Sequence, residues 1–205
     1  MRVNKTWKAS LVGALAILGA VGLLATALQP ALHSTPPASP AAEGAAAGAG
    51  GDASAAAARD AGTVAVGVTR PDCPTATVAG VALPCLGGQP GTAAPAPTVV
   101  TVWAWWCGPC REELPLFAQL QAAHPEWHVV GVHADDNAGA GAALLEELGV
   151  DLPSYEDATG VFAATHTLPN VVPITLFVHP TGAVTTHAKP YTTLDELEAD
   201  AAAAL

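Results

Sequence analysis

Along the C-terminal two thirds of the chain, the spacing of hydrophobic residues switches between a pattern typical of strands and one typical of helices. These switches predict strands and helices in turn. Short runs rich in β-branched and aromatic residues are typical of buried strands, at residues 98–104, 127–133 and 174–178. Residues 111–123 carry apolar side chains at helical spacing, and residues 138–148 do so again before a glycine. Strands that alternate with helices predict an α/β fold.

The region after residue 178 predicts an antiparallel strand and a final helix. Pro180-Thr181-Gly182 is a turn signal, after which residues 183–187 can return beside the preceding strand. Thr193 precedes Asp195 and Glu196, which favours a helix with Thr193 as its N-cap and acids in its first turn. We therefore expect a mixed central sheet with helices on its faces.

The region before residue 98 predicts a small extension of this fold. Residues 64–68 are apolar and lead into a proline-containing loop. Residues 77–83 have short strand-like runs on both sides of Gly80 and predict a β-hairpin that turns at this glycine. The sequence therefore predicts one globular domain over residues 63–205, with an N-terminal β-hairpin extension.

An apolar segment near the N-terminus predicts a membrane-spanning helix. Residues 9–28 carry no charge and are long enough to cross the roughly 30 Å hydrocarbon core of a bilayer. Residues 1–8 are basic and no further Lys or Arg occurs before Arg59, so the positive-inside rule places the domain outside the cytoplasm. A cleaved signal peptide is the alternative, since Ala25-Thr26-Ala27 has the form of a cleavage site. Both interpretations give the same compartment.

A flexible linker is predicted between this segment and the domain. Residues 29–62 consist mostly of Ala, Pro, Gly and Ser, with few charges. Such a composition cannot bury enough apolar surface to offset the entropy lost on ordering. We expect the linker to be disordered and to let the domain move near the membrane.

The most specific motif is Trp106-Cys107-Gly108-Pro109-Cys110, which lies between the strand at 98–104 and the helix at 111–123. A helix N-terminus carries unpaired N–H groups and a partial positive charge, and both stabilise a thiolate, the form that attacks disulfides. Cys107 is the expected nucleophile. Cys110 lies three residues later on the same side of the first turn and is the expected resolving thiol.

Two alternatives for this pair are a zinc site and a purely structural disulfide, because cysteines at this spacing also bind zinc. A zinc site needs two more ligands, and His133 and Asp135 are the imaginable ones. They stand at a predicted strand end, where polar residues usually cap and turn the chain. We therefore expect no metal.

The remaining cysteines, Cys73 and Cys85, are expected to pair with each other if Cys107 pairs with Cys110. A bond between them would close a loop around the predicted hairpin, and we expect it to be structural. The alternative is that this pair passes electrons to Cys107 and Cys110.

The chain resembles the TlpA-like, membrane-anchored thiol-disulfide oxidoreductases, which have a thioredoxin fold. The resemblance covers about residues 64–205 and is strongest at residues 103–115, which follow the pattern aromatic-Ala-x-Trp-Cys-x-x-Cys-x-x-Glu-x-Pro, and at residues 171–177. Thr101 stands where asparagine is frequent and Val102 where phenylalanine is expected. We expect these two departures to repack the strand only.

The resemblance also implies roles for several residues. Pro173 matches a cis-proline beside the active disulfide, and Val172 before it would pair its backbone with a substrate strand; an ordinary trans-proline is the alternative. Glu113 matches an acid behind the cysteines that could accept the proton of Cys110, although a solvated carboxylate is equally compatible with the spacing. The implied substrate contacts are Trp106, Gly108, Pro109 and Val172.

Composition excludes some partners. The chain has 205 residues and a formal net charge of -11 at pH 7, which argues against nucleic acid and acidic membrane surfaces. We expect a monomer without cofactor that acts on exported thiol or disulfide proteins and exchanges electrons with a membrane donor or acceptor. Gly108-Pro109 between the cysteines favours reduction, as in thioredoxin, and the resemblance suggests apocytochrome c as one client. The alternatives are an oxidant of exported thiols and a redox-inactive peptide-binding module.

Overall fold

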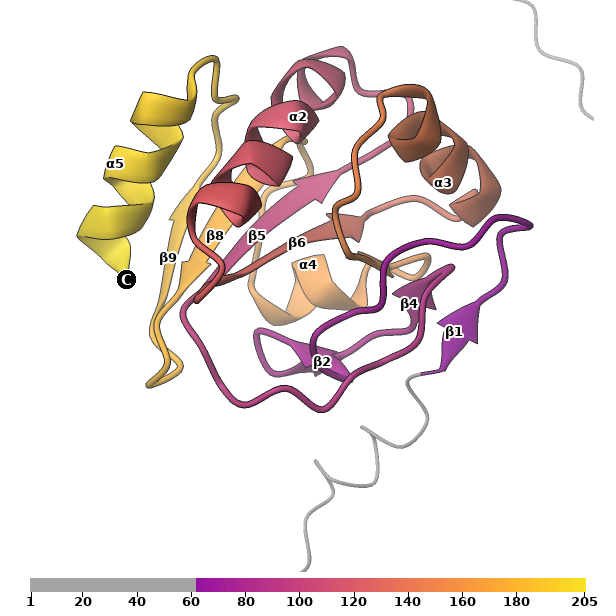
Figure 1. The fold of residues 1–205 in the computed structure, drawn as a ribbon, viewed down its shortest axis with the longest axis horizontal. Helices are drawn as coiled ribbons and strands as arrows, with labels where there is room; N and C mark the ends of the chain where they lie inside the picture. Colours follow the sequence, from indigo (N-terminus) through magenta and orange to yellow (C-terminus); the bar gives the residue numbers. More distant parts are fainter. Residues whose placement is uncertain (1–61) are drawn as a thin grey trace, which may run out of the picture. The chain divides into compact units, whose positions relative to one another are not determined.

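A computed structural model describes residues 62–205 and arranges most of their strands in one seven-stranded sheet (Figure 1). In order across the sheet, the strands are β1 (Thr63–Val64), β4 (Cys85–Leu86), β7 (Ser154–Glu156), β6 (His128–His133), β5 (Thr98–Trp103), β8 (Ile174–Val178) and β9 (Val184–His187). Strands β5, β6 and β7 are parallel, whereas β8 runs antiparallel to both β5 and β9. The sheet is therefore mixed, as the hydrophobic pattern predicts.

Helices cover both faces of the sheet. They are α2 (Gly108–Ala123), α3 (Ala138–Glu147), α4 (Val161–Thr165) and α5 (Leu194–Ala204). Helices α2, α3 and α5 share one apolar core with Val99 and Trp103 of β5, while α4 shares a second core with Val100 and Val102. Figure 1 shows α2 in front of the sheet, α4 behind it, and α5 at the left beside β9. Strand β5 thus lies between two cores, which explains its run of apolar residues.

A hairpin stands apart from the main sheet. Strands β2 (Thr77–Val78) and β3 (Val81–Ala82) pair antiparallel around the turn Ala79-Gly80, and Gly80 has φ +80°. A positive φ suits glycine because it has no Cβ. Val78 and Val81 of the hairpin are buried in the same core as α4, so this predicted extension covers part of the second face.

The boundaries of the elements differ from the prediction mainly near the cysteines. Helix α2 begins at Gly108, three residues before its predicted start, because Cys107 is its N-cap and accepts the backbone N–H of Cys110. Strand β1 ends at Val64, and the rest of the apolar residues 64–68 is loop. The short elements β4, β7 and α4 were not predicted.

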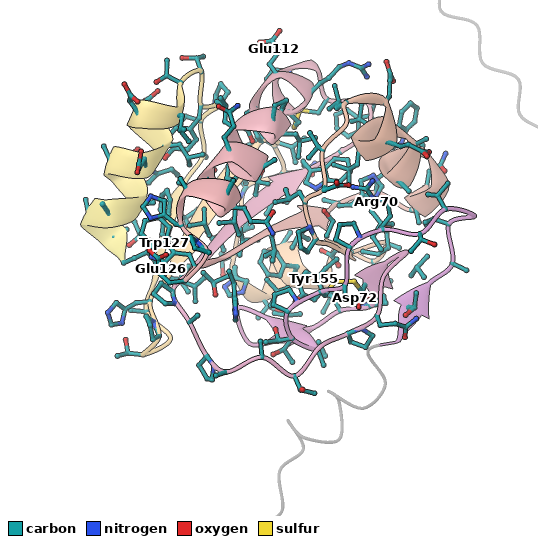
Figure 2. The ribbon with its side chains drawn as sticks, in the orientation of Figure 1. Arg70, Asp72, Glu112, Glu126, Trp127 and Tyr155 are labelled. Atoms are coloured by element: carbon teal, nitrogen blue, oxygen red, sulfur yellow. A yellow bond between two sulfur atoms is a disulfide. The ribbon has the colours of Figure 1, made fainter. Side chains whose placement is uncertain are left out.

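The disulfide between Cys73 and Cys85 agrees with the expected pairing. Cys85 lies on β4 opposite Tyr155 of β7, and Figure 2 shows the bond beside Tyr155 and Asp72. The exposed fractions of the two cysteines are 1% and 0%. A sulfur so enclosed gives an incoming thiolate little access, which favours the structural role.

Replacing Cys73 and Cys85 together by alanine is expected to lower the free energy of unfolding by about 3 kcal/mol, since the bond closes a short loop in the unfolded chain. Urea unfolding measures the loss, and the rate of disulfide exchange should not change. Mass spectrometry after mild reduction provides the opposing test. A Cys73–Cys85 bond that opens together with Cys107–Cys110 would contradict a purely structural role.

The predicted anchor at residues 9–28 and the predicted linker at 29–62 lie outside the described residues, apart from Gly62. Within residues 62–205, none of the helices combines the length and apolar character that crossing a membrane requires.

Candidate active site

Cys107 and Cys110 form a disulfide at the first turn of α2. The Cys107 Sγ also accepts the backbone N–H of Cys110 at 3.2 Å, so it lies at the positive end of the helix. The exposed fraction is 5% for Cys107 and 0% for Cys110. An external thiol or thiolate can therefore approach Cys107. It cannot approach Cys110, which has no exposed surface. This difference in access matches the predicted roles of nucleophile and resolving thiol.

A buried carboxylate lies one turn farther along α2. Glu113 has no exposed surface, and each of its carboxylate oxygens accepts one hydrogen bond. The Thr101 hydroxyl of β5 donates to Oε1 at 3.0 Å, and the backbone N–H of Tyr191 donates to Oε2 at 3.1 Å. Burial raises the pKa of Glu113 from 4.5 to about 7, although both hydrogen bonds act against this rise. Glu113 can therefore take up and release a proton near neutral pH.

The segment that carries Tyr191 is held in place by α5. The Tyr191 hydroxyl donates to Asp200 at 2.8 Å, and Lys189 forms ion pairs with Asp200 and Glu196. His187, at the end of β9, lies 2.8 Å from the same hydroxyl. These contacts fix the loop between β9 and α5, so the N–H that reaches Glu113 is positioned before any reaction takes place.

Thr101 and Tyr191 are site residues that the sequence patterns did not predict. Thr101 does more than repack the strand, because its hydroxyl is a hydrogen-bond partner of the buried acid. The alternation of β5 could have indicated this, since Thr101 lies between Val99 and Trp103 on the face that α2 covers. No comparable signal marks Tyr191, which is separated from Glu113 by 78 residues and contributes a backbone group.

Pro173, which the resemblance predicts to be a cis-proline, lies beside a groove. The peptide bond between Val172 and Pro173 is cis, and Pro173 directly precedes β8. A groove of about 410 Å³ opens between the segment before β8, α4 and the tryptophan of the motif. Its apolar walls include Trp106, Leu168, Pro169, Val171, Val172 and Ile174. The groove therefore offers apolar surface next to Cys107.

The four predicted substrate contacts divide into two groups. Trp106 and Val172 both line the groove. Gly108 and Pro109 do not line it but lie exposed at the start of α2. All four can meet a molecule that approaches Cys107 from solvent.

His133 and Asp135, which a zinc site would need, have other partners. His133 is buried, and its Nδ1 lies 2.9 Å from a carboxylate oxygen of Glu156. Asp135 accepts the indole N–H groups of Trp105 and Trp106. Among residues 62–205 no cluster of three or more His, Cys, Asp or Glu side chains is arranged to hold a metal ion.

Comparison with known proteins gives partial matches. No protein-family model matches the chain. The thiol-disulfide oxidoreductase ResA of Oceanobacillus iheyensis is 28% identical over 102 residues, which are 49% of this chain and 53% of ResA. A thiol:disulfide interchange protein DsbE homolog of Paracoccus denitrificans is 42% identical over 61 residues, 30% of each protein. The chain thus spans about half the length, or less, of the curated relatives it matches.

Solved structures match over a larger part of their length. The structure of MTB DsbF, in mixed oxidized and reduced forms, superimposes with a TM-score of 0.54 at 28% identity, over 60% of this chain and 93% of DsbF. The chain is thus similar to thioredoxin-like thiol-disulfide oxidoreductases. A secreted disulfide oxidoreductase of Mycobacterium tuberculosis, homologous to E. coli DsbE, matches the thioredoxin-like domain with a TM-score of 0.52 at 28% identity, over 59% of this chain and 93% of that protein. The expected fold is therefore confirmed for the described residues.

Proposed function

We propose that this protein is a TlpA-like, extracytoplasmic thiol-disulfide oxidoreductase that reduces disulfides of exported proteins. The observation that carries the proposal is the Cys107–Cys110 disulfide at the N-terminus of α2, backed by the buried carboxylate of Glu113. A purely structural disulfide needs neither a helix N-terminus nor an acid whose pKa is raised to about 7. Both features favour thiol exchange coupled to proton transfer near neutral pH.

In the reductive direction the enzyme starts with two thiols. The Cys107 thiolate attacks one sulfur of a substrate disulfide, forms a mixed disulfide and releases the other sulfur as a thiolate. Cys110 then attacks the Sγ of Cys107 and releases the second substrate thiolate. Two electrons pass to the substrate, and the enzyme is left with the Cys107–Cys110 bond. An external dithiol must then reduce this bond, and we assign that role to a membrane electron donor.

Glu113 takes part in the second step as proton acceptor. Cys110 is buried and loses its thiol proton before it attacks, and a carboxylate with a pKa of about 7 can accept this proton at neutral pH. The hydrogen bonds from Thr101 and Tyr191 stabilise the ionised form in the low-dielectric interior. The same acid returns the proton when the disulfide is reduced.

The groove beside Cys107 is the proposed binding surface for the substrate polypeptide. Trp106 and Val172 lie on its walls, and Pro173 has no N–H to donate. The backbone of Val172 is thus the proposed partner of a substrate strand. An apolar groove of this size accepts a few side chains of an unfolded client rather than a large folded surface.

The proposed location rests on the sequence and on the relatives. The basic residues 1–8 and the apolar residues 9–28 predict an anchor or a signal segment. One of the matching oxidoreductases is secreted. Disulfides also persist mainly outside the cytosol, and all four cysteines of this chain are paired. An anchored domain would keep the site within reach of a membrane electron donor.

A redox titration of the full-length protein, combined with an insulin-reduction assay, tests the proposal. The Gly-Pro pair between the cysteines also occurs in thioredoxin, and we expect a potential close to the roughly -270 mV of that reductant. A potential above about -200 mV would instead support the alternative role as oxidant. Tight peptide binding without any exchange would support the redox-inactive binding module and refute the proposed enzyme.

A further inference from the structure

Two adjacent tryptophans and one aspartate meet at the edge of the sheet beside the disulfide. Trp105 and Trp106 follow β5, and Asp135 follows β6. Because β5 and β6 are parallel neighbours, the segments after them leave the sheet at the same edge. The Trp105 Nε1 donates to Asp135 Oδ1 at 3.1 Å, and the Trp106 Nε1 donates to Oδ2 at 2.8 Å. One carboxylate thus binds both indole N–H groups.

Asp135 is itself fixed by the start of α3. Its Oδ1 accepts the backbone N–H of Asn137 at 2.9 Å, and the Asn137 side chain caps α3 by accepting the N–H of Ala140 at 3.1 Å. Partial burial raises the pKa of Asp135, but the hydrogen bonds from Asn137 and both indoles outweigh it and hold this pKa below its ordinary value. The carboxylate is therefore ionised at neutral pH, and its hydrogen bonds are charge-assisted.

Both indoles remain on the surface although their N–H groups are bound. The exposed fraction is 41% for Trp105 and 59% for Trp106. Large exposed aromatic side chains are costly in water, whereas they are favoured where a partner binds. Trp106 lines the groove, and Trp105 is its neighbour in the chain. With their N–H groups bound to Asp135, both indoles still leave part of their ring surface exposed to solvent.

We propose that Asp135 is a positioning residue that holds Trp105 and Trp106 as one aromatic platform beside Cys107, and that Trp105 extends the surface that contacts a polypeptide substrate. The proposal rests on the proposed function, because it assigns a substrate to the same site. The platform binds the client, whereas the sulfurs perform the exchange. Asp135 therefore acts on the affinity for polypeptides and leaves the chemical steps unchanged.

Steady-state kinetics with two substrates separates these effects. In Asp135→Asn, we expect the KM for insulin to rise about tenfold at nearly unchanged kcat, because one charge-assisted hydrogen bond is lost. The rate with hydroxyethyl disulfide, which is too small to need the platform, should stay at the wild-type value. Asp136→Asn is the matched control, since Asp136 is an exposed neighbour with the same charge. It should leave both substrates unaffected.

A double-mutant cycle distinguishes positioning from a general effect on the fold. In Trp105→Phe/Trp106→Phe the rings keep their apolar faces but lose the N–H groups that Asp135 binds, so Asp135→Asn should have no further effect on KM in this background. An equal rise of KM in both backgrounds, an unchanged KM in the single variant, or a parallel loss with hydroxyethyl disulfide would each overturn the inference. Wild-type protein that is inactive toward both substrates would overturn the proposed function itself.

Discussion

Cys107→Ser is expected to abolish the reduction of insulin, whereas Cys110→Ser is expected to perform the first step and stop there. Serine is not ionised at neutral pH and cannot replace the thiolate that Cys107 provides at the N-terminus of α2. Without Cys110 the mixed disulfide has no internal thiol to resolve it. The Cys110→Ser variant should therefore accumulate as a covalent adduct with its substrate, which non-reducing electrophoresis and mass spectrometry detect.

The reverse outcome would exchange the two roles. An adduct that accumulates on Cys110 in the Cys107→Ser variant would mean that the buried Cys110 thiolate attacks the substrate first, against its lower exposure. The wild-type protein with free thiols blocked after full oxidation provides the control, since it retains both bonds but has no thiolate to begin the reaction.

Glu113→Gln is expected to slow disulfide exchange by about 10²-fold near pH 8, because general acid-base catalysis contributes effects of this order. In the wild-type protein the rate should rise with pH through about 7, where Glu113 loses its proton. This inflection should be absent from the Gln variant. Stopped-flow measurement of the resolving step across pH 5 to 9 gives the ratio of the two rates and the pH of the inflection.

The same substitution should change how stability depends on pH. The pKa of Glu113 is raised in the folded protein, so the folded state binds this proton more tightly than the unfolded chain does. Its contribution to stability is full below pH 4.5 and is lost as the pH rises through about 7. A pKa raised from 4.5 to about 7 corresponds to roughly 3 kcal/mol over this interval. Urea unfolding should show this decline in the wild-type protein and not in Glu113→Gln.

The fold should tolerate this substitution. The amide oxygen of Gln can accept the Tyr191 N–H, and the Thr101 hydroxyl can accept from the amide nitrogen instead of donating. Glu112→Gln is the matched control: Glu112 precedes Glu113 on α2, and Figure 2 shows it pointing away from the core. It should alter neither rate nor stability. Identical exchange kinetics of Glu113→Gln and wild type across the pH range would refute the role as proton acceptor.

The sequence predicts elements well where a single segment carries the signal. Strands β5, β6 and β8 contain continuous β-branched and apolar residues because both of their faces are buried, and the hydrophobic pattern locates all three within one residue. Helix α5 follows from its Thr193 cap, which the structure retains. Strands β4 and β7 are too short for such a pattern and exist because neighbouring strands supply their hydrogen bonds.

At the candidate site, too, the sequence predicts the features that lie within one segment. The cysteine spacing predicts the disulfide, and the turn of the helix places Glu113 behind it. Contacts between distant segments were not predictable, because they depend on how strands are ordered. The position of Asp135 at a strand end predicts a cap or turn residue, and Asp135 does accept the N–H of Asn137. Its bonds to both indoles need β5 and β6 as neighbours.

The hydrogen bond between Glu113 and Tyr191 also sets an order of events during biosynthesis. The ribosome adds Tyr191 78 residues after Glu113, and Asp200 on α5, which holds the Tyr191 side chain, comes later still. A nascent chain that already exposes both active cysteines therefore lacks the backbone donor of its buried acid. Its thiols remain without a positioned proton acceptor until α5 packs against α2. On the proposed function, we therefore expect the full rate of disulfide exchange only after the C-terminal segment has folded against α2.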